Sequence, residues 1–478
     1  MSISVDEYTK NFNAEHSQFS LSKWIHDHPT AVKVAQVAGL MLGSAAVVAS
    51  SLFAPVLPVG IVVAIGLVGG LSILSSIVSW LFLKYVTCAK NDMTIHAYQE
   101  KICEGGRLYY RGDIPVMEFT GNDPEKWGHA HGFLLGAEIC KLKKNLDLAV
   151  HSILGLPRSE NLPNVLSTVR QKIPFEYLQE MKGLAVGYNE WATQAEASLR
   201  ITEDDLLLMH LIPDSKHFHP KALEKAWSEH LPGKEETRSV ACTSILDRDD
   251  QGNVIFGRNM DWCPFGEAGG KSLVMVWKNK GVAVLGVPGM IGAVTGWNRD
   301  KVAIAMNVCP GETTDVLGMP AILFNRHVLE STTSVLTIRR LVDDEQPLGP
   351  YHLTMADSTE GSCISFYQED GNNHRRDLTD RHIEVLNWEY PKCEGGFFNS
   401  QYRHELLAPY FNNARNIPNR HPKLMENALQ IPPYINSWIT MHSLVFRPST
   451  NQVKMSWDNG YAASGRWAEA EMTAFFEL

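Results

Sequence analysis

The most constraining feature of this sequence is a long stretch without charge near its N-terminus. Residues 34–83 contain no Asp, Glu, Lys or Arg, and Pro55 and Pro58 divide them into two apolar segments, 34–54 and 59–83. A helix needs ~20 residues to cross the ~30 Å of hydrocarbon in a bilayer, and each segment has about that length. The sequence therefore predicts a transmembrane helical hairpin over residues 34–83.

The residues within and around this stretch indicate how the hairpin would pack and which way it would face. Gly39 and Gly43, and likewise Gly66 and Gly70, stand one helical turn apart, which lets helix backbones approach closely in lipid. Lysines flank the two outer ends of the stretch, at Lys10, Lys23, Lys33, Lys84 and Lys90. The positive-inside rule then predicts a two-pass membrane protein with both termini, and the folded part after the hairpin, on the cytoplasmic side.

The stretch admits two other interpretations. A buried helical hairpin in the core of a soluble protein is the main alternative, although two uncharged runs of this length are rare in such cores. A cleaved signal peptide fits worse, because the stretch begins at residue 34 and a second apolar segment follows the first.

The overall composition excludes some classes of partner and site. The chain has 44% apolar and 20% charged residues, as folded proteins do, and a net charge of -10 without a dense Lys/Arg cluster. Nucleic acid is therefore not an expected partner. The eight cysteines are scattered and form no CxxC pair, so we expect mostly reduced thiols and no structural zinc.

The periodicity of apolar residues changes near residue 239. Before it, apolar residues recur every three to four positions, which predicts a mainly helical region with helices over 132–149, 175–191 and 203–211. After it, short strands separated by turn signals are expected over 239–246, 254–257, 273–276, 282–287 and 302–308. Helical patterns near 321–340 and 421–430 interrupt them, so the fold class is α+β with layered sheets and helices.

Cys242 begins a pattern in which three chemically useful side chains converge. It lies in a strand-like segment, Gly252 marks a turn, and a second strand-like segment reads Phe-Gly-Arg-Asn-Met-Asp-Trp over residues 256–262. A hairpin that turns at Gly252 brings Arg258 and Asp261 back beside the thiol. Each residue alone is compatible with core packing or a polar loop. Together they predict a cysteine next to a cation and a carboxylate.

This pattern resembles the N-terminal-nucleophile (Ntn) hydrolases of the choloylglycine hydrolase, acid ceramidase and penicillin acyltransferase group. In that group a cysteine and a glycine turn precede Gly-Arg-Asn-Met-Asp at this distance. Further likeness lies in Trp-Gly-His-Ala-His-Gly at residues 127–132, and the whole resemblance spans roughly residues 127–420. It implies an Ntn αββα sandwich preceded by a helical propeptide. The expected domains are an N-terminal segment, the hairpin, the helical propeptide and the catalytic domain, at 1–33, 34–83, 89–241 and 242–478.

The resemblance also implies further site residues. Asn307, in Ala-Met-Asn-Val-Cys-Pro, matches the family's oxyanion asparagine, and Asn399, in Phe-Phe-Asn-Ser, matches its second asparagine. Arg420 is the expected distal arginine, with Arg415 and Arg403 as alternatives. Donors around Asn307 and Asn399 would stabilise a tetrahedral oxyanion, at ~3 kcal/mol for each well-placed donor. Neither a metal nor an organic cofactor is expected.

The chemistry of an N-terminal cysteine explains why these groups belong together. A thiol ionises near pH ~8.5 and a free α-amine near ~7.7, so the amine of the same residue can accept the thiol proton. This requires cleavage of the Ala241–Cys242 bond by the thiol itself. Arg258 would favour the thiolate, and Asp261 would orient the α-amine. The two cleaved halves are expected to remain associated.

The expected reaction is hydrolysis of a non-peptide amide through a thioester on Cys242. The membrane hairpin favours a lipid-like N-acyl amide, and Trp262, Phe265 and Trp297 could line the acyl site, although core packing explains them equally well. Acyl transfer to an amine is the alternative reaction. A non-enzymatic, uncleaved relative that binds lipid or a partner is the alternative class. His129 and His131 are expected to satisfy local hydrogen bonds rather than to carry protons.

Overall fold

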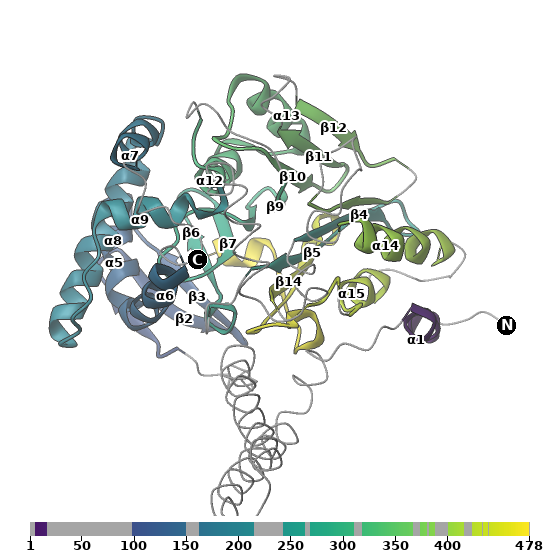
Figure 1. The fold of residues 1–478 in the computed structure, drawn as a ribbon, viewed down its shortest axis with the longest axis horizontal. Coiled ribbons are helices and arrows are strands. Elements are labelled where there is room, and N and C mark those ends of the chain that lie inside the picture. The colour runs from purple at the N-terminus through teal and green to yellow at the C-terminus, as the bar shows by residue number, and fades with distance from the viewer. Residues whose placement is uncertain are drawn as a thin grey trace, which may run out of the picture. The chain divides into compact units, whose positions relative to one another are not determined.

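Two stacked β-sheets form the centre of the protein in the computed structural model (Figure 1). The structure describes residues 5–16, 98–149, 162–214, 242–262, 268–309, 318–366, 373–379, 382–387, 400–414, 423–432, 434–437 and 439–477. These residues belong to one compact unit formed by Met1–Ser17 and Met93–Leu478. The hairpin predicted over residues 34–83 lies outside the described residues. Within them, no helix combines the length and the apolar character that crossing a membrane requires.

The larger sheet has ten strands in the order β1-β2-β3-β6-β7-β8-β9-β10-β11-β12. Their bounds are β1 Lys101–Cys103, β2 Gly106–Arg111, β3 Ile114–Phe119, β6 Leu273–Trp277, β7 Val282–Gly286, β8 Thr295–Asn298, β9 Ala303–Val308, β10 Tyr351–Ala356, β11 Gly361–Phe366 and β12 Asn373–Asp377. All neighbours pair antiparallel except β3 and β6, which are parallel. β8 and β9 form a hairpin, and Asn307 lies on β9.

The smaller sheet has six antiparallel strands in the order β13-β4-β5-β14-β15-β16. Their bounds are β4 Thr243–Arg248, β5 Val254–Asp261, β13 Ile383–Val385, β14 Thr440–Arg447, β15 Gln452–Trp457 and β16 Ala468–Glu471. Alternate side chains of both sheets meet in one apolar core, with Trp297 and Val276 from the larger sheet against Phe256 and Phe446 from the smaller one. Period-two alternation along each strand produces this shared inner layer.

Helices cover the outer face of each sheet, which gives the four-layer αββα arrangement (Figure 1). The larger sheet carries α5 Pro124–Leu134, α6 Gly136–Ala149, α7 Leu162–Arg170, α8 Phe175–Gln194, α9 Glu203–His210, α12 Ala321–Ser331 and α13 Val335–Asp344. The smaller sheet carries α1 Val5–His16, α14 Ser400–Ala414 and α15 Lys423–Leu429. The fold is thus a mixed α/β fold in which helices bury the apolar outer side of both sheets.

The region before Cys242 is mainly helical, as expected from the sequence, but it also contains three strands that were not expected. Residues 101–119 form β1, β2 and β3, and β3 pairs in parallel with β6 from Val116↔Val274 to Phe119↔Trp277. Ile-Pro-Val-Met-Glu-Phe, the segment that forms β3, is buried at every position and has no helical period, and it pairs with β2 on one side and with β6 on the other. The upstream region and the catalytic region therefore share one hydrogen-bonded sheet.

Glycines allow α5 and α8 to pack backbone against backbone. A Cβ placed on Gly128 would lie 1.8 Å from the carbonyl oxygen of Glu180, and one on Gly183 would lie 1.9 Å from that of Glu125. No side chain fits at either position, so any larger residue would separate the helices. The segment over residues 127–132, in which the sequence resembles the family, therefore forms part of the contact between these helices.

Candidate active site

The β4–β5 hairpin positions the nucleophile candidate and its charged neighbours. Cys242 immediately precedes β4, and the pairing Ser244↔Arg258 sets the register of the hairpin. The turn between the strands needs Gly252, whose φ of +84° few other residues adopt. The hairpin expected from the sequence is confirmed, and it places Arg258 and Asp261 at the same end of the sheet as Cys242.

The thiol of Cys242 lies next to a buried guanidinium. Nη2 of Arg258 is 3.0 Å from the sulfur, and Cys242 is 4% exposed while Arg258 is fully buried. The same guanidinium is fixed by Met306, whose carbonyl oxygen accepts from Nη2 at 2.6 Å. A cation at this distance in a site shielded from water stabilises negative charge on sulfur.

Asp261 is buried beside the same cysteine. Its Oδ1 accepts from the hydroxyl of Thr440 at 2.6 Å, and its backbone oxygen is 3.9 Å from the sulfur of Cys242. Burial raises the pKa of Asp261 to about 8, while the hydroxyl of Thr440 and the charges of Arg403 and Arg258 act in the opposite direction. Oδ2 has no hydrogen-bond partner among the described residues. The carboxyl can therefore receive one more donor at this position.

Arg403 is a second fully buried arginine at the site, contributed by α14. Its Nη1 donates to the carbonyl oxygen of Cys242 at 2.5 Å and to the hydroxyl of Thr243 at 3.0 Å. Its Nη2 donates to Oδ1 of Asn387 at 3.0 Å. Burial lowers the pKa of Arg403 to about 10, so the group keeps its charge at neutral pH. Of the three candidates for the distal arginine, Arg403 lies at the site, and the other two, Arg415 and Arg420, lie outside the described residues.

Asn307 contacts the backbone of Cys242. Its Nδ2 donates to the carbonyl oxygens of Cys242 at 3.0 Å and Val385 at 2.7 Å. Its Oδ1 accepts from Nη1 of Arg258 and from the hydroxyl of Ser244, each at 2.7 Å. In this structure Asn307 therefore positions Cys242 and Arg258. Asn399, the other expected oxyanion donor, lies outside the described residues.

The structure adds three polar residues that sequence reasoning did not name. Ser244 stands two positions after Cys242 on the same side of β4, and this spacing is a signal that could have been used. Thr440 reaches Asp261 only because β14 pairs with β5, and Asn387 reaches Arg403 across a tertiary contact. No local sequence pattern indicates that Thr440 or Asn387 belongs to the site.

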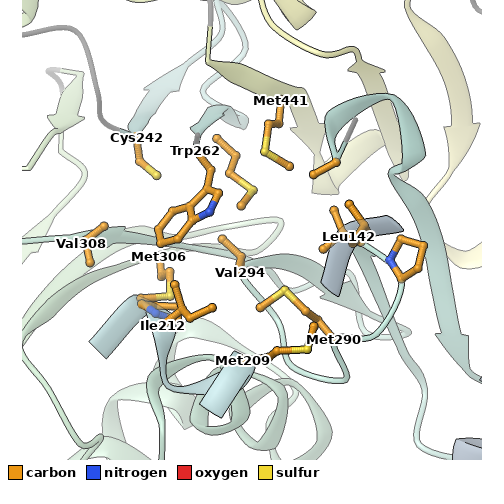
Figure 2. A pocket seen from close by; sticks show the side chains of 15 residues that line it. Leu142, Met209, Ile212, Cys242, Trp262, Met290, Val294, Met306, Val308 and Met441 are labelled. Carbon is orange, nitrogen blue, oxygen red and sulfur yellow. The ribbon is translucent and has the colours of Figure 1, made fainter. Parts of the chain in front are cut away.

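An apolar cavity of about 790 Å³, counting its part open to solvent, lies beside the thiol of Cys242 (Figure 2). Apart from Cys242, its lining consists of aliphatic, methionine, proline and tryptophan side chains: Leu142, Met209, Ile212, Pro213, Met260, Trp262, Ala268, Val287, Pro288, Met290, Val294, Met306, Val308 and Met441. The upstream and downstream regions both contribute to this wall. The cavity can therefore hold a hydrocarbon chain with one end at the sulfur.

The three aromatic residues expected at the acyl site differ in their placement. Trp262 lines the cavity, where Figure 2 shows its indole close to Cys242. Trp297 does not, which corrects the expectation: it is buried between the sheets against Phe446 and Phe475, and its Nε1 donates to the carbonyl oxygen of Met472 at 2.9 Å. Strand alternation turns Trp297 toward this inner core. Phe265 lies outside the described residues.

The cysteines and the possible metal ligands can be checked among the described residues. The structure describes Cys103, Cys140, Cys242, Cys309 and Cys363, and no disulfide joins any two of these five residues. Among the described side chains, no group of three or more His, Cys, Asp or Glu residues is arranged to hold a metal ion.

Comparison with known proteins supports the same group. The model of the family "acyl-coenzyme A:6-aminopenicillanic acid acyl-transferase" matches residues 248–461. The chain resembles the Ntn hydrolases. This likeness, expected from the residues around Cys242, is thereby confirmed. No curated protein matches the chain.

Solved structures with a similar arrangement include an N-acylethanolamine-hydrolyzing acid amidase ortholog from Caenorhabditis elegans, with 17% identity and a TM-score of 0.37 over 44% of this chain and 93% of the other. They also include two conjugated bile acid hydrolase variants from Clostridium perfringens, each matched over 49% of this chain and 94% of the other. These have 10% and 11% identity and TM-scores of 0.35 and 0.31.

Proposed function

We propose that this protein is a membrane-anchored cysteine Ntn hydrolase that cleaves the amide bond of a lipid-like N-acyl amide. The observation that carries the proposal is the position of the Cys242 thiol, which lies between the guanidinium of Arg258 at 3.0 Å and a cavity lined by apolar side chains. A nucleophile placed between a buried cation and a hydrocarbon site suits an acyl group better than a peptide, whose backbone needs polar partners.

Activation would begin with attack of the Cys242 sulfur on the carbonyl carbon of Ala241. The carbon–nitrogen bond breaks, a thioester forms, and the freed nitrogen becomes the α-amine of Cys242. Water then hydrolyses the thioester, which releases the carboxylate of residue 241 and regenerates the thiol. The carbonyl oxygen of Cys242 receives hydrogen bonds from Arg403 and Asn307, and these contacts would hold the new N-terminal residue in place after cleavage.

In turnover the α-amine would take the thiol proton, and the thiolate would attack the substrate carbonyl. The tetrahedral intermediate collapses to a thioester on Cys242 as the amine leaves with a proton, and water then releases the carboxylic acid. The unpartnered Oδ2 of Asp261 is suited to accept a hydrogen bond from the α-ammonium. Arg258 would stabilise the thiolate, and Asn399 would help to stabilise the oxyanion.

The nature of the cavity supports a long or bulky apolar acyl group. Five of its lining residues are methionines, whose unbranched side chains adapt to different hydrocarbon shapes, namely Met209, Met260, Met290, Met306 and Met441. Each acyl methylene that leaves water for such a site contributes ~0.8 kcal/mol. An amine in place of water at the thioester would give acyl transfer, the reaction named by the family model that matches residues 248–461. Product analysis with and without added amine separates the two reactions.

We further propose that residues 34–83 anchor the protein as a two-pass hairpin with both termini and the catalytic domain on the cytoplasmic side. Contacts on both sides of this segment support an even number of crossings. α1 packs on α14 and α15, where the hydroxyl of Tyr8 donates to the carbonyl oxygen of Tyr410 at 2.7 Å and Nδ2 of Asn427 lies 3.3 Å from Asp6. Because α1 and the domain after residue 93 form one compact unit, they must lie on the same side of the membrane, and the segment between them must cross it an even number of times.

Mass determination and N-terminal sequencing of the purified protein test the proposed function directly. We expect fragments of residues 1–241 and 242–478 that copurify, because β3 and β6 hydrogen-bond across the cleavage point. Cys242→Ala should remain a single chain and should hydrolyse no N-acyl amide. Cys242→Ser should be cleaved more slowly, since a hydroxyl is the weaker nucleophile. Hydrolysis of amides by a wild-type protein that stays uncleaved would disprove the proposed mechanism.

A further inference from the structure

One wall of the acyl cavity is a loop whose shape is set by hydrogen bonds from elsewhere in the protein. Residues 287–294, here called the wall loop, connect β7 to β8 and contribute Val287, Pro288, Met290 and Val294 to the cavity (Figure 2). Within the loop, the N–H of Met290 donates to the carbonyl oxygen of Val287 at 3.3 Å, and the carbonyl oxygen of Val294 accepts from the N–H of Met306 on β9 at 2.9 Å. The N–H groups of Gly289 and Ile291 take their acceptors from outside the loop.

Two buried histidines from the upstream helices hold this loop. Nε2 of His131, on α5, accepts from the backbone N–H of Gly289 at 2.9 Å. Nε2 of His210, at the end of α9, accepts from the backbone N–H of Ile291 at 2.8 Å. The two contacts bracket Met290, which points into the cavity. Both imidazoles are fully buried.

The hydrogen bonds define the protonation of both rings. Nδ1 of His210 lies 2.7 Å from the carbonyl oxygen of Leu206, an acceptor, so Nδ1 carries the proton and Nε2 is free to accept. An imidazolium has no lone pair, so the Nε2 of His131 can likewise accept only while that ring is neutral. Burial lowers the pKa of His131 to about 3 and that of His210 to about 4, in agreement with neutral rings.

A neutral imidazole suits the surroundings of the wall loop as an acceptor for its N–H groups. Met209 and Ile139 pack against Gly289, and a carboxylate here would bring an unpaired charge into an apolar environment. The other side of the loop is fixed by Arg326, which donates to the carbonyl oxygen of Ile291 at 3.1 Å. Neither histidine is among the residues that line the cavity.

We propose that His131 and His210 are positioning residues that set the length of acyl chain the cavity accepts, by holding the wall loop through its N–H groups. The inference rests on the proposed function, because it takes an acyl chain as the occupant of the cavity. Losing either acceptor would let the loop shift, and the lining residues Met290 and Val294 would no longer fit the far part of a long chain. A short chain, held near Cys242, would be little affected.

Fatty-acid binding to the Cys242→Ala protein tests this without depending on turnover. The probe is cis-parinaric acid, displaced by octanoic or palmitic acid. His131→Leu and His210→Leu remove the acceptor, and we expect roughly tenfold weaker binding of palmitic acid with less than about twofold change for octanoic acid. His131→Gln and His210→Gln keep an acceptor oxygen and should recover most of the affinity for palmitic acid. His129→Leu is the matched control, on the same helix but with its ring paired to Glu190 at 2.8 Å.

Several results would overturn the inference. Equal losses for octanoic and palmitic acid, Leu variants that bind like His129→Leu, or no binding of either acid to the histidine-bearing protein would each do so. If the Leu variants fail to fold in a thermal melt, Gly289→Ala displaces the same peptide from the loop side, because its φ is +94°. That variant must then show the same selective loss of palmitic acid. Palmitic acid binding without amide hydrolysis by the Cys242 enzyme would refute only the proposed function.

Discussion

The wall formed by Trp262 gives a quantitative prediction about substrate length. For N-acyl amides of one fluorogenic amine in mixed micelles, kcat/KM should rise as the acyl chain grows into the apolar cavity. At ~0.8 kcal/mol per buried methylene, four added methylenes contribute ~3 kcal/mol, or roughly 200-fold from hexanoyl to decanoyl. This value is an upper bound, since free acyl chains already bury part of their surface in micelles.

Substituting Trp262→Ala should flatten this rise. An indole face covers on the order of 50 Å² of a hydrocarbon chain lying against it, which at ~25 cal/mol per Å² is ~1.3 kcal/mol or about tenfold. Counted as contact with the methylenes that only the decanoyl chain has, this loss lowers the ratio of decanoyl to hexanoyl kcat/KM to about 20. Trp191→Ala is the matched control, because Trp191 is also partly buried but packs beside Tyr188, away from the cavity.

Two outcomes would refute this reasoning. A preference of the wild type for acetyl amides, or for unmodified peptides, would exclude a lipid-like amide as the substrate and leave the chemistry of Cys242 intact. An unchanged chain-length ratio in Trp262→Ala, or an equal change in Trp191→Ala, would show that the indole does not contact the acyl chain.

Three further predictions concern the membrane, pH and stability. Residues 34–83 should keep the protein in the pellet after alkaline carbonate extraction, and release into the supernatant would contradict the hairpin. Asp261 has a folded-state pKa of about 8, above its unfolded value, so its contribution to stability is full below about pH 4 and is lost as pH rises to about 8. In urea melts of the uncleaved Cys242→Ala chain, Asp261→Asn should remove this decline and raise stability at pH 7, and an unchanged pH profile would refute the burial argument. Arg326→Met should lower the free energy of unfolding by about 3–5 kcal/mol, because it leaves Glu180 buried without its partner at 2.7 Å; a loss below about 1 kcal/mol in the same assay would argue against it.

The catalytic hairpin could be predicted because its signals are local. Cys242, the turn at Gly252 and the Arg258–Asp261 segment lie within one stretch, and a two-strand hairpin has a period and a turn that sequence alone displays. The five strands expected between residues 239 and 308 and the helices of the upstream region were predictable for the same reason, within a few residues at their ends, whereas the strands from β10 onward were not among those expected. The strands over residues 101–119 were missed although β1–β2 and β2–β3 are local hairpins that turn at Gly105 and Gly112; only the pairing of β3 with β6 depends on a segment far along the chain.

The hydrogen-bond partners at the site could not be predicted from local sequence patterns. The family resemblance left three arginines as candidates, and only the packing of α14 brings Arg403 to the carbonyl oxygen of Cys242. Asn307 was expected to stabilise an oxyanion, yet the structure directs its amide to backbone carbonyl groups. Where a planar amide or guanidinium points depends on every neighbour within hydrogen-bond distance, and most of those neighbours are remote in sequence.

By itself the sequence determined the thiol, its cation and its carboxylate, together with the uncharged stretch over residues 34–83, because hairpin spacing and segment hydrophobicity are local properties of a chain. Only the packed structure places Trp262 on the wall of the apolar cavity and Trp297 between the sheets, and brings His131 and His210 into hydrogen bonds with the wall loop. These placements depend on which strand faces and helix ends meet when the four layers pack. The contacts that result join residues far apart in the sequence, so no short segment of the chain can predict them.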